Sequence, residues 1–140
     1  MTQEEKKALL LKDLCARLPY NPMVEYKGET YSVLGIVHGR LALCKPFMSY
    51  TLDECPPAKE VKPYLFPISS MTEAIKDEIY QETGLYDIFE DNQIHIEVGT
   101  NFTDICKLFN ILNKHHIDYK GLISMGLAID ATGLNIYIIT

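Results

Sequence analysis

Met23–Cys44, MVEYKGETYSVLGIVHGRLALC, alternates runs of β-branched and aromatic residues with short turn sequences. The runs 23–26 and 30–37 are joined at 27–29, and a second turn at 38–40 leads into 41–44 and then 47–52. Short runs of this composition separated by glycine-containing turns are typical of antiparallel hairpins. We therefore predict a small antiparallel meander, which its twist curls toward a partial barrel.

Helical periodicity precedes this meander. Thr2 and Glu5 have the spacing of a capping box, and leucines then recur at helical spacing until Pro19. After the meander, residues 53–60 have the composition of a loop. The proline-containing run 61–67 is typical of an edge strand, because proline cannot donate to a neighbouring strand.

The second half of the chain returns to helical patterns. A capping box at Ser70 and Glu73 predicts a helix that Gly84 ends, and Asn101 predicts the start of another. Alternation at 94–98 and an apolar run at 134–139 predict strands. The expected fold is a single α+β domain over 1–140, with an N-terminal helix, a meander subregion at 20–68 and a helix-strand-helix layer in a helical subregion at 69–140.

Composition places the chain among ordinary soluble domains. Its 140 residues are 47% hydrophobic and 23% charged, which is enough to bury a core without a metal or disulfide. The charged N-terminus contains no apolar run of membrane or signal-peptide length, so we predict a cytoplasmic protein without a membrane partner. Of the cysteines, Cys15, Cys44 and Cys106 have apolar neighbours and are predicted to be buried, whereas Cys55 is predicted to be exposed.

Acidic residues concentrate in the second half of the chain. Residues 1–70 carry nine basic and eight acidic residues (net +1), whereas residues 71–140 carry four and eleven (net −7). A protein that binds a phosphate backbone normally shows a clustered basic face. The distribution therefore argues against a nucleic-acid partner. It leaves room for a basic protein partner or for a surface that imitates nucleic acid, although a solvated acidic surface is the simpler interpretation.

Three segments carry a resemblance. They are KPYLFPISSMT at 62–72, LNKHHIDYKGLI at 112–123 with MGLA at 125–128, and LPY at 18–20. Together they resemble an abundant group of short uncharacterised proteins encoded by gut bacteria and their phages. The resemblance spans most of the chain and implies a phage or mobile-element setting, but it implies no activity or cofactor.

One hypothesis treats the protein as a metal- or small-molecule-binding protein. Its candidate ligands are His95, His115, His116 and Asp118, which would converge from a helix end and a strand. Adjacent residues on a helix point about 100° apart, so the paired histidines would face one ion only beyond the helix end. We therefore favour no metal, and the sequence contains no nucleotide-binding or nucleophile motif that would indicate a cofactor or an enzyme.

A second hypothesis is a non-enzymatic accessory protein that acts through contacts with a host or phage protein. Tyrosine suits such contacts, because it supplies apolar area together with a polar tip. The candidate partner-binding residues are Tyr26, Tyr31, Tyr50 and Tyr64 around the meander, and Glu73, Asp77 and Glu78 on the second helix. An exposed strand at Ile136 to Ile139 would also permit a homo-oligomer. We adopt this second hypothesis.

Overall fold

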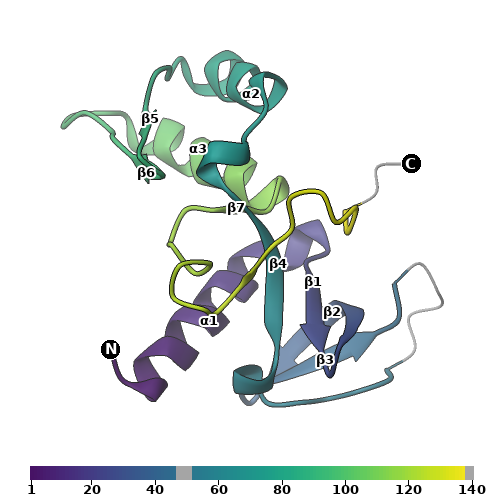
Figure 1. The fold of residues 1–140 in the computed structure, drawn as a ribbon. Coiled ribbons are helices and arrows are strands. Elements are labelled where there is room, and N and C mark those ends of the chain that lie inside the picture. Colours follow the sequence, from purple (N-terminus) through teal and green to yellow (C-terminus); the bar gives the residue numbers. More distant parts are fainter. Residues whose placement is uncertain (47–51, 138–140) are drawn as a thin grey trace.

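A computed structural model describes residues 1–46 and 52–137 (Figure 1). The described residues form α-helices and a mixed sheet, so the predicted α+β class is confirmed. The α-helices are α1 (Gln3–Arg17), α2 (Glu73–Thr83) and α3 (Phe102–Lys114). The strands are β1 (Met23–Tyr26), β2 (Glu29–Val37), β3 (Arg40–Cys44), β4 (Lys62–Pro67), β5 (Phe89–Glu90), β6 (Gln93–Ile94), β7 (Ile117–Asp118) and β8 (Ile129–Asp130).

Figure 1 shows two lobes, with β4 running from one into the other. The sheet lobe contains α1 and the strands β1 to β3, and the helical lobe contains α2, α3 and the β5–β6 hairpin. Each lobe has its own apolar core. The first core centres on Leu14, Leu41 and Leu65, and the second on Ile79 and Leu112.

The predicted meander is confirmed over its described part. β1 pairs with β2 and β2 with β3, both antiparallel. In the first turn Lys27 and Gly28 have φ of 52° and 80°, and in the second His38 and Gly39 have φ of 52° and 75°. Two successive residues with positive φ are typical of type I′ turns, whose twist matches the flanking strands. The predicted strand at 47–52 falls almost entirely on 47–51, outside the described residues.

β4 is a central strand, so the predicted edge position of 61–67 is wrong. The sheet order is β3-β2-β1-β4-β7, and β8 also pairs with β4. Pro63 lies opposite Val24 of β1, before the parallel pairing with β8 begins at Tyr64, and Pro67 is the last residue of the strand. The prolines thus stand near the two ends of β4, where a missing N–H interrupts the ladder least.

The strands that complete the sheet come from the predicted helical subregion. β7 and β8 are each two residues long and run parallel to β4. The division at residue 69 therefore does not separate sheet from helices. The described strands leave the sheet open rather than closed into a barrel. At its β3 edge, Arg40 and Leu43 form isolated bridges to Pro57 and Glu54 of the following loop.

The described part of the second half of the chain contains fewer strand residues than predicted, and α3 buries only one of its faces. The buried side of α3 is formed by Leu108, Ile111 and Leu112, whereas Phe102 is 78% exposed. The strand expected over 94–98 is limited to Gln93–Ile94, which pairs with β5 across a turn. Residues 134–137, the described part of the last predicted strand, contain no strand. The edge proposed for self-association is therefore absent from residues 136 and 137.

The start of α2 also differs from the prediction. Thr72 caps the helix, because its hydroxyl accepts a hydrogen bond from the backbone N–H of Ile75 at 3.3 Å. Ser70 lies in the preceding 3-10 helix, and its hydroxyl contacts Thr132 instead. The predicted end is confirmed, since Gly84 follows the helix with φ of 75°.

This cap gives a first testable expectation. Changing Thr72→Ala should lower the free energy of unfolding by about 1 kcal/mol, because the helix loses the acceptor for one of its free N–H groups. Changing Ser70→Ala is the matched control and should cost less, because Ser70 caps no helix. Urea denaturation of both variants measures the difference, and equal losses would contradict the assignment of the cap.

The exposure of Cys15 and Cys106 depends on the helix face that each residue occupies and not on how apolar its neighbours in the sequence are. Cys44 is buried and Cys55 is exposed, as predicted. Cys15 and Cys106 are exposed, so the prediction of buried thiols is wrong at both. The buried face of α1 passes through Leu14, and Cys15 lies about 100° away from it.

Within residues 1–46 and 52–137, no helix combines the length and apolar character needed to cross a membrane.

Candidate functional site

An ion pair is enclosed where the two lobes meet. Asp13 and Arg17 lie one turn apart on α1, and each side chain has 0% exposure. Nε of Arg17 donates to Oδ2 of Asp13 at 2.9 Å, and Nη2 donates to Oδ1 at 3.1 Å. Two parallel hydrogen bonds between a guanidinium and a carboxylate form one of the stronger charged pairs in proteins. Each buried charge is therefore compensated by the opposite charge of the other residue, within hydrogen-bonding distance.

Arg17 also connects α1 to the segment after α3. Nη2 donates to the carbonyl oxygen of Ile117 in β7 at 2.7 Å, and the guanidinium lies 5.2 Å from the centre of the Tyr119 ring. Nζ of Lys120 is 3.6 Å from the Asp13 carboxylate. Burial lowers the pKa of Lys120 and raises that of Tyr119. We call Asp13, Arg17, Tyr119 and Lys120 the junction cluster.

His116 is buried beside this cluster, immediately before β7. It has φ of 58°, and its carbonyl oxygen accepts a hydrogen bond from Phe66 N at 2.8 Å, which extends the β4–β7 pairing. The residue is 6% exposed, and Nδ1 is buried without a hydrogen-bond partner among the described residues. Burial lowers the pKa of His116 to about 3, and the charges of Arg17 and His115 act in the same direction. The imidazole is therefore neutral at pH 7.

The Tyr137 ring covers His116. The two rings stack with their centres 3.6 Å apart and their planes 11° apart. The Tyr137 hydroxyl accepts from Met23 N at 2.9 Å and donates to the carbonyl oxygen of Tyr64 at 2.8 Å. Burial raises the pKa of Tyr137. These contacts fasten the segment after β8 to β1 and β4.

A cavity of about 550 Å³ adjoins this stacked pair. Its walls come from the chain between α1 and β1, from β4, from the start of α2, from the end of α3 and from Tyr137. Its lining is mostly apolar and includes Met23, Phe66 and Ile75. The volume lies in the range of small-molecule sites. Of the hollows in the described structure, we take this one as the candidate ligand site.

The predicted histidine–aspartate cluster does not form. His95 is exposed, and His115 Nε2 lies 2.8 Å from Glu78 on α2. The Asp118 carboxylate accepts hydrogen bonds from the backbone N–H groups of Leu122 and Ile123, at 2.9 Å each. Among the residues that the structure describes, no three histidine, cysteine or acidic side chains are placed to share a metal ion.

The predicted tyrosine surface is wrong for three of its four members. Tyr26, Tyr31 and Tyr64 are 7%, 6% and 8% exposed, and Tyr50 lies outside the described residues. Tyr26 and Tyr31 belong to the sheet-lobe core, with their ring centres 6.2 Å apart. The rings face inward because α1 covers that side of the sheet, and the Tyr31 hydroxyl still reaches a polar partner, Glu29, at 3.1 Å.

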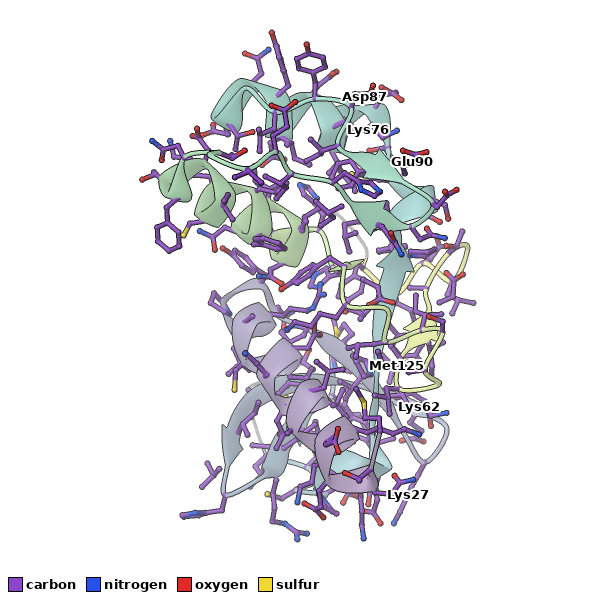
Figure 2. The ribbon with its side chains drawn as sticks, turned by 90° about the vertical axis from the view of Figure 1, so that its left-hand side faces the viewer. Lys27, Lys62, Lys76, Asp87, Glu90 and Met125 are labelled. Atoms are coloured by element: carbon purple, nitrogen blue, oxygen red, sulfur yellow. The ribbon has the colours of Figure 1, made fainter. Side chains whose placement is uncertain are left out.

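Exposed tyrosines occur instead on the helical lobe. Tyr80 and Tyr86 are 51% and 75% exposed, and their rings meet edge to face with centres 6.0 Å apart. They line a hollow of about 510 Å³ together with the acidic residues Glu73, Asp77 and Asp87. We call these five residues the α2 surface. Figure 2 shows Asp87 near Lys76 at the outer end of the helical lobe, with Lys27 at the opposite end of the molecule.

Helical spacing separates the predicted acidic residues. Glu73 and Asp77 share a face with Tyr80, because positions i, i+4 and i+7 align on a helix. Glu78 points toward α3, where it contacts both Lys114 and His115. Although burial opposes its ionisation, these hydrogen bonds lower the pKa of Glu78. Glu73 and Asp77 therefore belong to the α2 surface, and Glu78 joins α2 to α3. The same i, i+7 spacing in the sequence indicates that Tyr80 lies on the face of Glu73.

The chain was compared with protein-family models, with curated proteins and with solved structures, and none of these comparisons gave a match.

Proposed function

We propose that this protein is a non-enzymatic accessory protein of a phage or mobile element and that it acts through protein–protein contacts. Its contact site is the α2 surface, and the partner presents a segment rich in lysine or arginine. The observation that carries this proposal is the exposed pair Tyr80 and Tyr86, which stands in a hollow beside three carboxylates. The phage or mobile-element setting rests on the resemblance of the segments 18–20, 62–72 and 112–128.

The chemistry of the α2 surface favours a basic partner. Tyrosine is enriched at protein interfaces and gives a large contact area at a small cost in conformational entropy. A lysine or arginine side chain over a tyrosine face adds a cation–π attraction. Asp77 and Asp87 supply negative charge around the two rings, and Glu73 contributes less because Lys76, the basic residue in the lining, lies 3.6 Å from its carboxylate. The tyrosine rings and the carboxylates thus attract the same lysine and arginine side chains of the partner.

Direct binding tests this proposal. We expect short fluorescent peptides with repeated lysine or arginine to bind more tightly than matched peptides with glutamate or serine, as measured by fluorescence anisotropy. The affinity should fall as salt is raised, because exposed charges are screened. The double substitution Tyr80→Ala and Tyr86→Ala should weaken binding by roughly tenfold or more, as expected for loss of central aromatic contacts.

Phe102→Ala is the matched control, because Phe102 is an aromatic residue with 78% exposure that lies outside the α2 surface. It should leave the affinity for basic peptides unchanged. Thermal melts should show that all variants are folded. Equal binding of basic and acidic peptides, or equal losses from the control and the tyrosine variant, would overturn the proposal.

A further inference from the structure

The hydroxyl of Tyr137 takes the place of one backbone pairing between β1 and β4. These antiparallel strands are paired as far as Val24 and Pro63. In the same register, the next pair would be Met23 and Tyr64. The Tyr137 hydroxyl lies at this position, since it accepts a hydrogen bond from Met23 N at 2.9 Å and donates one to the carbonyl oxygen of Tyr64 at 2.8 Å. A side chain from a distant segment therefore fills a gap in the ladder.

The socket around the Tyr137 ring is built from elements that are joined to one another independently. The ring stacks on His116 with the centres 3.6 Å apart, and it lies 6.0 Å from the ring of Phe66. Phe66 N donates a hydrogen bond to the carbonyl oxygen of His116 at 2.8 Å, so β4 is paired again directly beyond the gap. This hydrogen bond does not involve Tyr137. It can therefore persist when the Tyr137 ring leaves the socket.

The segment that carries Tyr137 has few other attachments. Residues 133–135 are exposed, whereas Ile136 and Tyr137 are half-buried and pack against the small apolar cluster around Met23. Among residues 1–46 and 52–137, the hydrogen bonds that join 133–137 to β1 and β4 come from the Tyr137 hydroxyl. We call residues 133–137 the strap. Two side chains, Ile136 and Tyr137, hold it against the sheet.

This imbalance of contacts favours local opening of the strap. Segments with few buried apolar contacts and an exposed backbone open at a lower free energy than the core of a domain. The strands beneath the strap are held much more firmly, because Val24 and Leu65 are fully buried in the core of the sheet lobe. The free energy of opening is therefore set mainly by the contacts of Ile136 and Tyr137, and not by the stability of either lobe.

We propose that the strap opens as a local unit while both lobes stay folded, and that Tyr137 is the latch that closes it. Opening uncovers Met23 N and the carbonyl oxygen of Tyr64. It also removes one wall of the cavity of about 550 Å³, because Tyr137 is among the lining residues. The strap thus controls access to this cavity. The inference does not depend on the α2 surface, whose residues belong neither to the strap nor to its socket.

Hydrogen exchange of single amides, followed by ¹H–¹⁵N NMR at several low urea concentrations, tests the proposal on the unmodified protein. The N–H of Met23 reports opening, because its acceptor is the Tyr137 hydroxyl. The N–H groups of Phe66, in β4, and of the fully buried Leu112, in α3, serve as controls. Local opening exposes little surface, so exchange at Met23 should be nearly independent of urea and, after correction for intrinsic rates, roughly tenfold or more faster than at the controls.

Two substitutions within the strap show whether its opening is what exposes Met23. Ile136→Ala removes apolar contacts of the strap and leaves the acceptor of Met23 N in place, so exchange at Met23 should accelerate by roughly tenfold. Leu134→Ala is the matched control, because Leu134 is in the same segment but is 50% exposed and lies outside the cluster. It should leave the exchange rate of Met23 unchanged. Thermal melts should show that both variants are folded.

Each result decides for or against the strap. Exchange at Met23 that accelerates with urea in parallel with Phe66 and Leu112 would show that the socket opens only on global unfolding, and would overturn the proposal without the use of any variant. Equal exchange rates at Met23 in the Ile136→Ala and Leu134→Ala variants would mean that the end of β1 frays by itself, which also overturns it. Neither measurement uses a basic peptide, so both stand even if the proposal for the α2 surface is wrong.

Discussion

Replacing Arg17 with methionine should lower the free energy of unfolding by about 3–5 kcal/mol, because it leaves the Asp13 carboxylate without its main partner. The carboxylate has 0% exposure and accepts two hydrogen bonds from Arg17. The hydrogen bond to the carbonyl oxygen of Ile117 would be lost as well. Urea denaturation at neutral pH measures the change.

The double variant Asp13→Leu with Arg17→Met separates charge from packing. Since it removes both charges, it should be more stable than Arg17→Met alone, and the coupling should appear as a clear departure from additivity. Lys120 would retain its charge but is 21% exposed and can turn toward solvent. A double variant whose loss equals the sum of the two single losses would contradict the view that the two charges depend on each other.

Acidification should lower the free energy of unfolding already at pH values above those at which carboxylates titrate. The pKa of His116 is about 3 in the folded protein, against an ordinary value of 6.5. Between these values the unfolded chain binds the additional proton, so stability falls as pH decreases through this window. One pKa unit corresponds to 1.36 kcal/mol, so lowering the pH from 6.5 to 4.5 should cost about 2–3 kcal/mol.

The variant His116→Asn tests this assignment through the pH dependence of the free energy of unfolding and not through its value at a single pH. The variant should have a lower stability at pH 7, because the ring stacked on Tyr137 is lost, but a flatter dependence between pH 6.5 and 4.5. Glu29 and Glu78 also contribute, since their folded pKa values are lowered. Their contributions are present above about pH 4.5 and are lost below it. An unchanged slope in the variant would show that His116 does not cause the effect.

Local patterns predicted the elements well. The two hairpin turns, the Thr2 and Asn101 caps and the glycine after α2 depend on residues close in sequence, and all lie at their expected places. The α+β class followed from them. The central position of β4 in the sheet did not follow from local patterns, because its partners β7 and β8 are two-residue strands more than 50 residues away. Strands that short have no periodicity to detect.

The candidate sites were predicted less well, because burial decides them. Tyr31 alternates along β2, and only the packing of α1 determines which face of that strand is covered. Arg17 would normally be expected at the surface, and nothing in its neighbourhood indicates its contact with Ile117, 100 residues away. The sequence predicts Glu73 and Asp77 at the contact site, and the i, i+7 spacing from Glu73 places Tyr80 on the same helix face.

The pairing of β4 has a consequence for synthesis. The nascent chain can form α1 and the β1–β3 meander early, but the residues that complete the pairing of β4 emerge only at 117–130. Until then β4 has an unpaired edge and Arg17 lacks its distant acceptor. Unpaired edges promote aggregation of incomplete chains. Premature termination before residue 117 should therefore yield a polypeptide that depends on chaperones, although its first 67 residues contain most of the sheet.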